Sequence, residues 1–406
     1  MNVLLVGSGG REHALAWRLA ASPALGQLHA APGNPGIAEL GDCHPVRAED
    51  VEGLVELARA LEPDLVVVGP EAPLVAGLAD ELRRSGIPVF GPGAQAARIE
   101  GSKTFAKEVM AAAGVPAART LPVARPPCVL KADGLAAGKG VFVCHSQEEL
   151  DAGLRAARGL GQPILIEELL EGEEISIFAL CDGVEALALP SAQDYKRAED
   201  GDEGPNTGGM GSFSPVAAYG PGEIEELVEA VHRPVLAELA RRRTPFVGTL
   251  FAGLMLTAEG PRVLEFNARF GDPEAQVLLP RLDDDLLGAL AAAAEGGLAG
   301  TTLEASPEAA VTVVVASADY PARSDAGTPI HGLAEAAEAG GLVFHAGTAL
   351  RGGELVTNGG RILDVTGVGP TVSAARSRAY DALGKISFEG MRYRSDIAAV
   401  AAGVGA

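Results

Sequence analysis

The chain has 406 residues, of which 47% are hydrophobic and 21% are charged, and its formal net charge is −22 at pH 7. That length is enough for two to four domains with a large buried core. A negative charge of this size would repel nucleic-acid phosphates over most of the surface, so the composition argues against a nucleic-acid partner. An anionic ligand would need a local site lined by basic side chains or backbone amides.

The four cysteines lie far apart in the sequence and form no CxxC pair, a distribution that favours neither a zinc knuckle nor a disulfide framework. We interpret them as small buried residues in a reducing compartment. The chain begins directly with the apolar stretch NVLLVG, and no apolar run approaches the length of a membrane span. We therefore expect a cytoplasmic protein with no membrane partner.

In the first hundred residues, short apolar runs alternate with stretches of helical periodicity. The runs lie at 3–7, 64–69 and 87–91, and helices are predicted at about 11–21 and 73–85. This alternation predicts a parallel sheet with helices on both faces. Ligands of such sheets bind at the carboxyl ends of the strands, where the sequence reads GSGG, GPEAP and GPG.

The next part of the chain has the pattern of antiparallel strands. The runs CVLKADG and GVFVCH flank a glycine-rich turn, and a helix follows in which Ser146 and Glu149 are spaced as a capping box. The strand PILIEELL comes next. An amphipathic helix is predicted at about 223–243, before the strand pair GTLFAGLML and RVLEFNARF.

An alanine-rich helix near 286–295 precedes the last part of the chain. That part has three strands ended by glycine, AVTVVVAS, GGLVFHAGT and GRILDVTGVG, and a helix at about 371–386. The segment 199–211 is a long polar loop rich in glycine, of the kind that is often functional. The sequence predicts three domains, with limits at 1–101, 102–305 and 306–406.

The sequence GSGGRE follows the first strand and opens a helix, as a dinucleotide-binding loop does. That motif requires a small residue where Glu12 stands, and an acidic residue after the second strand region, which reads LHAAPGNPG. A nicotinamide-dependent oxidoreductase is therefore the weaker alternative. The amides of Ser8, Gly9 and Gly10 could seat one phosphate at the helix N-terminus, and a tight turn without a ligand is an equal alternative.

The stretch KADGLAAGKGV places two of the six lysines of the chain around one turn. A P-loop needs four residues between its glycines, whereas three separate Gly134 from Gly138, and Gly140 stands where Ser or Thr would hold magnesium. The turn joins two apolar strands and predicts a glycine-rich hairpin. Its amides and Lys139 could cover phosphates while Lys131 projects from the strand beneath, and an exposed hairpin without a ligand is the alternative.

The strand VLEFNARF places Glu265, Asn267 and Arg269 on one face, because side chains two positions apart in a strand share a face. Burying these polar groups is costly unless an ionic ligand is bound there. Oxygen ligands suit magnesium, and a guanidinium suits a phosphoryl group that is being transferred. This face is therefore a candidate site for a magnesium nucleotide, and an ion pair between Arg269 and Glu265 is the alternative.

These features together resemble the ATP-grasp superfamily, with its phosphate-covering hairpin, strand lysine, acidic hinge (here EELL) and late Glu-x-Asn-x-Arg strand. The resemblance narrows to the glycinamide ribonucleotide synthetases, or phosphoribosylamine–glycine ligases. It rests on GSGGREHA, GPEAPL, EGSK, KADGLAAGKGV, PNTGGMG, EFNARFGDPE and VTNGGR, which occur in this order. It implies an α/β and α+β multidomain protein: a Rossmann-like parallel-sheet domain, an ATP-grasp fold with a mobile lid at about 119–170, and a small C-terminal α/β domain.

The resemblance also implies an activity, an ATP-dependent ligase of purine biosynthesis. In the family, the glycine carboxylate attacks the γ-phosphoryl group of ATP, and the amine of 5-phosphoribosylamine displaces phosphate from glycyl phosphate to give glycinamide ribonucleotide. The implied partners are small molecules, with ATP as co-substrate and Mg²⁺ or Mn²⁺ as the metal. A nucleotide sensor without catalysis is a further alternative. The sequence leaves the oligomeric state open, a monomer being one alternative.

Carried over to this sequence, the resemblance assigns the nucleotide-binding residues. Lys103 and Lys131 would contact the ATP phosphates. The hairpin turn that would cover them includes Gly134, Gly138, Lys139 and Gly140. The adenine would contact backbone groups of Glu167 and Leu169, and the ribose would contact Glu174. Glu265 and Asn267 would hold the metal, with Arg269 as the catalytic residue at the phosphoryl group.

The assignment of the other two substrates is less complete. For phosphoribosylamine the resemblance implies the amides of Gly9 and Gly10, with Glu71 near the ribose and Lys196 or Arg197 near the phosphate; for the glycine ammonium it implies Asp194 or Asp272. Two departures from the family pattern stand out. The strand TLFAGLML lacks the second metal carboxylate of many ATP-grasp enzymes, and Tyr195 stands where relatives have histidine.

Overall fold

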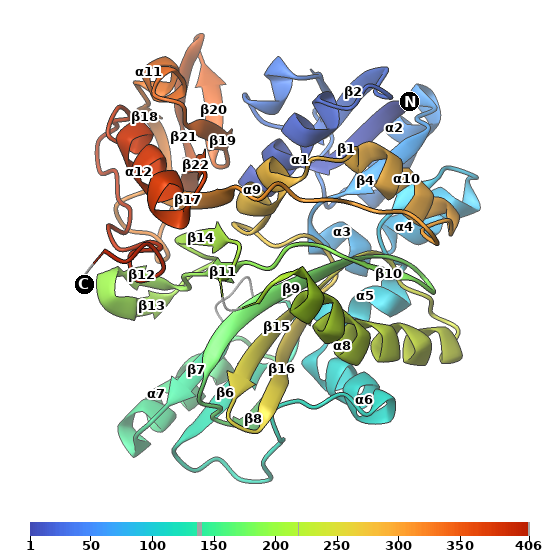
Figure 1. Cartoon of the computed structure of the whole chain (residues 1–406), viewed down its shortest axis with the longest axis vertical. Coiled ribbons are helices and arrows are strands. Elements are labelled where there is room, and N and C mark those ends of the chain that lie inside the picture. The colour runs from blue at the N-terminus through green and yellow to red at the C-terminus, as the bar shows by residue number, and fades with distance from the viewer. Residues whose placement is uncertain (136–139, 218, 405–406) are drawn as a thin grey trace.

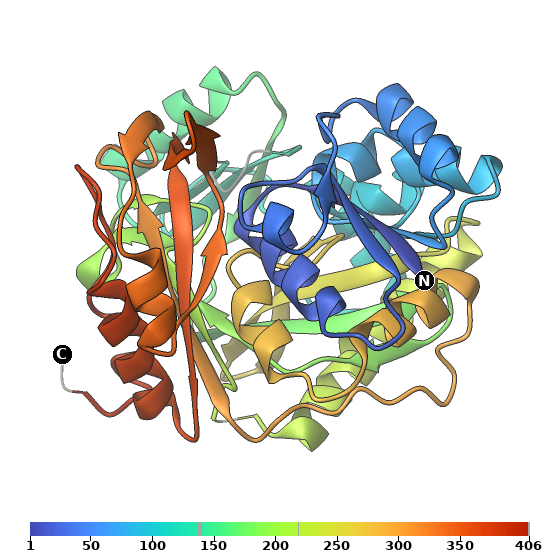
Figure 2. The ribbon, with the colours of Figure 1, turned by 90° about the horizontal axis from the view of Figure 1, so that it is seen from above.

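The computed structural model of the chain describes residues 1–135, 140–217 and 219–404. The N-terminal segment and the C-terminal segment lie side by side, and the long central strands β9 (Glu173–Asp182), β15 (Val247–Thr257) and β16 (Gly260–Asn267) lie below both in Figure 1 (Figures 1 and 2). No helix among the described residues combines the length and apolarity needed to cross a membrane.

The N-terminal segment forms a five-stranded parallel sheet in the order β3-β2-β1-β4-β5, which confirms the predicted parallel sheet. Its central strands β1 and β4 are buried except for the first residue of β1, as expected for a sheet covered on both faces. The strands are β1 (Asn2–Gly7), β2 (Gln27–Pro32), β3 (Asp42–Cys43), β4 (Leu65–Val68) and β5 (Val89–Phe90). The helices are α1 (Gly10–Ala20), η1 (Ile37–Glu39), α2 (Val51–Leu61), α3 (Glu71–Val75), α4 (Leu78–Arg84) and α5 (Ala94–Gly101).

The helix predicted at about 73–85 is wrong in one respect, because the structure divides it into α3 and α4. Gly77 lies between them with φ of +92°, in the left-handed region that interrupts a right-handed helix. The carboxyl ends of β1 and β4 still lie at one edge of the sheet, so GSGG and GPEAP meet there as predicted.

A small three-stranded antiparallel sheet, in the order β7-β6-β8, follows helix α6 (Lys103–Ala113). It contains β6 (Cys128–Ala132), β7 (Val141–Cys144) and β8 (Ile164–Glu168), with α7 (Gln147–Gly159) packed against it. The predicted hairpin is confirmed by the β6–β7 pairing, in which Lys131 lies opposite Val141. Gly138 and Lys139, predicted to cover phosphates, lie outside the residues that the structure describes.

The central sheet is antiparallel, in the order β10-β9-β15-β16, and α8 (Pro221–Arg241) packs against β9 and β10 (Ala186–Ala188). Strand β16 ends at Asn267, and Arg269 follows in a bend rather than in the strand. The expectation that Arg269 continues the strand is therefore wrong. The elements that follow are α9 (Ala275–Leu278), η3 (Leu279–Arg281) and α10 (Leu286–Glu295).

The C-terminal segment has a five-stranded antiparallel sheet in the order β11-β14-β17-β22-β19, covered by α12 (Val372–Leu383). A second, three-stranded sheet has the order β18-β21-β20. The strands are β11 (Gln193–Asp194), β14 (Gly211–Ser214), β17 (Ala309–Ala316), β18 (Asp325–Pro329), β19 (Leu342–His345), β20 (Thr348–Arg351), β21 (Glu354–Gly359) and β22 (Arg361–Gly369), and α11 (Leu333–Glu338) precedes β19.

Two strands of the C-terminal sheet, β11 and β14, come from the middle of the chain, so this sheet crosses the predicted limit between residues 305 and 306. Between them, the segment predicted as a long loop at 199–211 contains most of a short two-stranded ribbon. The ribbon consists of β12 (Arg197–Glu199), η2 (Asp200–Asp202) and β13 (Glu203–Asn206).

The capping box at the start of α7 generates a stability prediction. The Ser146 side chain accepts the amide hydrogen of Glu149, whose carboxylate accepts the Ser146 amide in return. Ser146→Ala should therefore destabilise α7 by about 1 kcal/mol, whereas Ser146→Thr keeps the cap and should cost less. Hydrogen exchange of the first α7 amides measures both variants, and equal exchange in the two would contradict the role of the cap.

Candidate active site

Two lysines, the buried Lys131 and the partly buried Lys107 of α6, share one carboxylate beside the small β7-β6-β8 sheet. Lys131 on β6 and Glu167 on β8 are diagonal neighbours on one face, and Lys131 Nζ lies 2.7 Å from Glu167 Oε2. The second oxygen of Glu167 lies 2.6 Å from Lys107 Nζ. Lys131 also donates to the carbonyl of Leu264 at 2.8 Å, which ties this sheet to β16. Glu167 is 1% exposed, so its carboxylate is a buried counter-charge.

Glu265 lies among four cationic side chains. Burial opposes its ionisation, but Lys196, Lys131, Lys103 and Arg269 outweigh that effect and hold the pKa of Glu265 below its ordinary value. Three of these cations also have ion-pair partners of their own, Lys131 with Glu167, Lys196 with Glu174 and Arg269 with Glu100. Cationic side chains gathered in this way are suited to contact the oxygens of a polyphosphate that carries a divalent cation.

Of the predicted nucleotide-binding residues, Lys103 belongs to this group of cations, and Glu174 lies close to it. Lys103 Nζ donates to the carbonyl of Gly134 at 3.0 Å, which holds the start of the hairpin turn against α6. Lys196 forms an ion pair with Glu174 and lies 4.0 Å from Asp194. The structure thus brings Lys196, Glu174 and Asp194 together near Glu265.

Glu265 and Asn267 lie on β16 and offer carboxylate and amide oxygens, the donors that magnesium prefers. In the part of the chain that the structure describes, no three His, Cys, Asp or Glu side chains are grouped to hold a metal ion. A donor set this small fits a magnesium ion that takes its other ligands from nucleotide phosphates and water, as magnesium commonly does.

Arg269 is held by carboxylates of the N-terminal segment. Its Nη2 lies 3.1 Å from Glu100 Oε1, and its Nε lies 3.4 Å from Glu71 Oε2. Glu71 also lies 3.9 Å from Arg11 Nη1, and these two arginines, acting against burial, lower its pKa to about 2. The alternative in which Arg269 pairs with Glu265 is therefore not the arrangement found. Glu71, predicted near the ribose, serves Arg269 and Arg11 instead.

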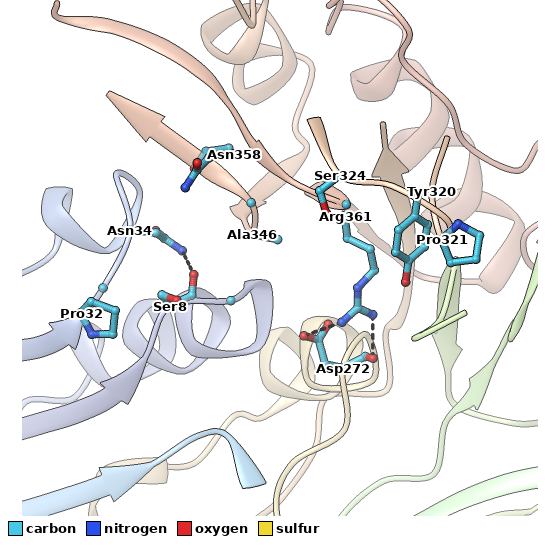
Figure 3. A pocket seen from close by; sticks show the side chains of 15 residues that line it. Ser8, Pro32, Asn34, Asp272, Tyr320, Pro321, Ser324, Ala346, Asn358 and Arg361 are labelled. Atoms are coloured by element: carbon cyan, nitrogen blue, oxygen red, sulfur yellow. Dashed lines mark hydrogen bonds and ion pairs between the residues drawn. The ribbon is translucent and has the colours of Figure 1, made fainter. Parts of the chain in front are cut away.

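A cavity of about 570 Å³ opens between the N-terminal and C-terminal segments (Figure 3). Arg361, the first residue of β22, points into it; its Nη2 lies 3.0 Å from Asp272 Oδ2, and its Nη1 donates to the carbonyls of Asp272 and Gly208. The cavity therefore joins the motifs GSGG, FGDPE and VTNGGR, and Arg361 connects it to Gly208 of PNTGG. Its lining includes Ser8, Gly9, Asn34, Asp272, Tyr320, Ser324, Thr348, Asn358 and Arg361.

Asn34 links two walls of this cavity, as Figure 3 shows on the side of Ser8. Its Nδ2 donates to the carbonyls of Ser8, at 2.9 Å, and His345, at 2.7 Å, and its Oδ1 accepts the amide of Ile37. Nearby, the His345 amide donates to Nδ1 of His13 at 2.7 Å. A satisfied, buried polar contact thus fixes the C-terminal segment against the N-terminal one.

The predicted phosphate seat at Gly9 is wrong. The Gly9 amide donates at 2.7 Å to Oε2 of Glu12, so a side chain of the same helix already occupies it. Glu12 is 2% exposed and lies so close to Gly7 and Gly69 that a Cβ on either would lie within 2.5 Å of it. A carboxylate here would repel a phosphate, which also removes the dinucleotide alternative.

Gly10 is buried, and a Cβ there would lie 1.8 Å from Asp364 Oδ2, so this glycine is required for packing.

Lys196 and Arg197 are not among the cavity-lining residues; Arg197 donates to the carbonyl of Gly204 within the β12–β13 ribbon. Arg361 is the basic side chain that the structure places there. Arg361 is the last residue of the motif VTNGGR, and the presence of an arginine in that motif is the feature of the sequence that could have pointed to it.

Family models cover most of the chain. The N domain of phosphoribosylglycinamide synthetase matches residues 1–100, its ATP-grasp (A) domain 101–275, and its C domain 310–400. A phosphoribosylamine–glycine ligase of Streptomyces coelicolor is 51% identical over 99% of this chain and 100% of its own. One of Mesorhizobium japonicum is 49% identical over 98% and 97%. The chain belongs to the phosphoribosylamine–glycine ligase family.

Solved structures agree with this assignment. A phosphoribosylamine–glycine ligase of Thermotoga maritima superposes with a TM-score of 0.85 at 35% identity, covering 98% of this chain and 100% of its own. A biotin carboxylase domain of Hydrogenobacter thermophilus shares the fold, with a TM-score of 0.68 at 19% identity over 97% and 91%. The predicted family, fold class and ligase assignment are confirmed.

The carboxylate between Lys107 and Lys131 leads to a prediction about stability without nucleotide. Glu167→Gln leaves the buried Lys131 ammonium and the partly buried Lys107 ammonium without this counter-charge and should lower the free energy of unfolding by about 3 kcal/mol. Glu168→Gln is a matched control, because its partner Arg119 is exposed and such a pair contributes less than about 1 kcal/mol. Urea unfolding compares them, and similar losses would show that Glu167 is not a buried counter-charge.

The histidines behind the cavity predict a pH dependence. Burial and the neighbouring His345 lower the pKa of His13 to about 3, and burial lowers the pKa of His345 to about 4. Between about pH 6.5 and pH 4 the unfolded chain binds protons that the folded histidines do not, so stability falls as the pH falls. From about pH 7 to pH 5.5 each histidine should account for a loss of about 1 kcal/mol.

The measurement is urea unfolding at these two pH values. His345→Gln should lose less stability between them than the wild type does, because one titrating group is gone. His145→Gln removes an exposed histidine and should keep the wild-type difference. If His145→Gln and His345→Gln reduced the pH dependence equally, burial would not be its cause.

Proposed function

We propose that this chain joins glycine to 5-phosphoribosylamine with the conversion of ATP to ADP and phosphate. A glycine carboxylate oxygen attacks the γ-phosphorus, the bond to ADP breaks, and glycyl phosphate forms. The amine nitrogen then attacks the glycyl carbonyl carbon, phosphate leaves, and one amine proton is released. The observation that carries this proposal is the group of four cations around Glu265, near a polar cavity with its own arginine.

The cations support a role for this region in binding ATP. Lys103 and Lys131 would contact the phosphates, with Gly134, Gly140 and the turn between them covering them. The backbone of the hinge at Glu167 and Leu169 would contact the adenine, because the side chain of Glu167 already forms ion pairs with two lysines. Glu174 remains the candidate for the ribose, in exchange for its ion pair with Lys196.

Glu265 and Asn267 would hold Mg²⁺ or Mn²⁺, whose charge would neutralise the phosphates. Arg269 would stabilise the charge that develops on the transferred phosphoryl group. Lys196, which lies near Glu265, is better placed for a phosphate of ATP than for that of phosphoribosylamine.

The cavity at Arg361 supports the binding of phosphoribosylamine, with the guanidinium as the phosphate contact and Ser8, Ser324 and Asn358 as polar neighbours. For the glycine ammonium, Asp272 is favoured over Asp194. Arg361 and Arg11, acting against burial, hold the pKa of Asp272 below its ordinary value, so it is ionised. Burial, with the neighbouring Glu274 and Glu174, outweighs Lys196 and raises the pKa of Asp194, so its charged form is less favoured than that of Asp272.

We also propose the domain limits 1–101, 102–305 and 306–406, with β11 and β14 contributed across the last limit, and a lid at about 119–170. The lid rests on its own small core of Cys128, Leu130, Cys144 and Leu150, separate from the two large cores. A segment with its own core can move as a unit when nucleotide enters or leaves.

The proposed reaction is tested by a coupled assay of ADP release with freshly prepared phosphoribosylamine. Release should require both glycine and phosphoribosylamine, and mass spectrometry should find glycinamide ribonucleotide. ADP release that is the same without either substrate would refute the proposal.

Two variants separate metal binding from phosphoryl stabilisation. Glu265→Gln removes a negative charge from the metal site, so its activity should recover in part with excess Mg²⁺. Arg269→Lys keeps a charge but loses the planar fork, so turnover should fall by about two to three orders of magnitude with nearly normal MgATP binding. Steady-state kinetics at several Mg²⁺ concentrations, with calorimetry of MgATP binding, compares them. Equal rescue of both variants would refute this division of roles.

A further inference from the structure

Arg269 needs support from outside its own strand. Strand β16 ends at Asn267, so no ladder of backbone hydrogen bonds fixes the bend in which Arg269 lies. The side chain has 17% of its surface exposed and reaches back toward the N-terminal segment. A long, flexible arginine contributes to phosphoryl stabilisation only if its guanidinium is held in place before the reaction.

Glu100, at the end of α5, holds both the backbone and the side chain of this bend. Its Oε2 accepts the amide of Ala268 at 2.7 Å, and its Oε1 lies 3.1 Å from Arg269 Nη2. The Glu100 side chain is 7% exposed, so water competes little for these contacts. One carboxylate thus fixes two adjacent residues.

Glu71 supports the opposite edge of the same guanidinium. It lies 3.4 Å from Arg269 Nε without forming a well-aligned hydrogen bond, and Arg11 lies 3.9 Å behind it. Arg11 and Arg269 both donate from Nη1 to the carbonyl of Phe270, at 3.3 and 3.1 Å, which holds the next residue of the bend. The contact of Glu71 is longer and more exposed than that of Glu100, so it is the weaker one.

These contacts leave part of the guanidinium for a ligand. Arginine has five N–H donors, and among the described residues the contacts of Arg269 use one donor of Nη1 and one of Nη2, while Nε lies beside Glu71 without a well-aligned hydrogen bond. One donor on each terminal nitrogen therefore remains for a ligand. A planar guanidinium with one free donor on each of these nitrogens has the geometry for two oxygens of one phosphoryl group.

We propose that Glu100, with Glu71 as a weaker second contact, is a positioning residue that holds Arg269 ready for phosphoryl transfer. The inference rests on the proposed function, because it takes the role of Arg269 from there. It adds that the N-terminal segment, which lines the substrate cavity through Ser8 and Gly9, also sets the geometry of phosphoryl transfer.

A double-mutant cycle tests this. Glu100→Gln should lower kcat by about tenfold and leave KM for ATP within about twofold of the wild type, because positioning matters most in the transition state. In the Arg269→Ala background, where nothing is left to position, the same substitution should lower the single-turnover rate by less than about twofold. Glu108→Gln, an exposed acid on α6, is the matched control and should keep the wild-type kcat.

Glu100→Asp keeps the charge on a shorter side chain and should recover part of the lost kcat, which a role confined to folding would not produce. If Glu100→Gln does not fold, as judged by thermal unfolding, the cycle is run with the more exposed Glu71→Gln, for which about a threefold loss of kcat is expected. An unchanged kcat, or an equal loss in both backgrounds, overturns the proposal. A wild-type enzyme without glycine-dependent ADP release refutes the proposed function instead.

Discussion

An acidic protein that binds anions must keep its cations at the ligand site, and burial of those cations requires counter-charges. The net charge is −22, and the candidate site meets this constraint with buried carboxylates that each hold a cation. Glu167 lies between two lysines, and Asp272 holds Arg361. Such pairs add little net stability, but removing one partner leaves the other charge buried and unpaired. Each partner of a pair therefore fixes the position of the other. The positive groups are therefore in place before any phosphate arrives.

Much of the fold follows from local patterns in the sequence. The apolar runs of the first hundred residues predicted the parallel sheet, and the Ser146–Glu149 spacing predicted the start of α7, because both depend on neighbouring residues. The errors arose where backbone geometry or distant contacts decide. Gly77 divides a predicted helix through its positive φ. The alternation of side chains along a strand predicts which residues share a face, but it could not show that β16 ends before Arg269.

The candidate site was predictable where one motif supplies both the residue and its neighbours. Glu265 and Asn267 lie together on β16, as their spacing predicted. Contacts between motifs were not predictable, because sequence spacing carries no information about which distant segments meet. Arg361 reaches Asp272 across 89 residues of chain, and only the packing of β22 against the rest of the fold brings them together. The occupied Gly9 amide was missed although Glu12, three residues on, is placed to cap it.

The segment around Tyr195 shows how alternation along an extended chain lets adjacent residues contact different parts of the fold. Its neighbours Asp194 and Lys196 lie near Glu265, with 4.0 Å between Lys196 Nζ and Asp194 Oδ1, and alternation along an extended segment directs Tyr195 the other way. There its hydroxyl accepts the amide of Ala398 at 3.0 Å, and its ring lies 4.9 Å from the guanidinium carbon of Arg394. The tyrosine thus anchors the segment to the C-terminal residues. The tyrosine side chain faces this anchor, whereas the acid and the lysine beside it lie near Glu265.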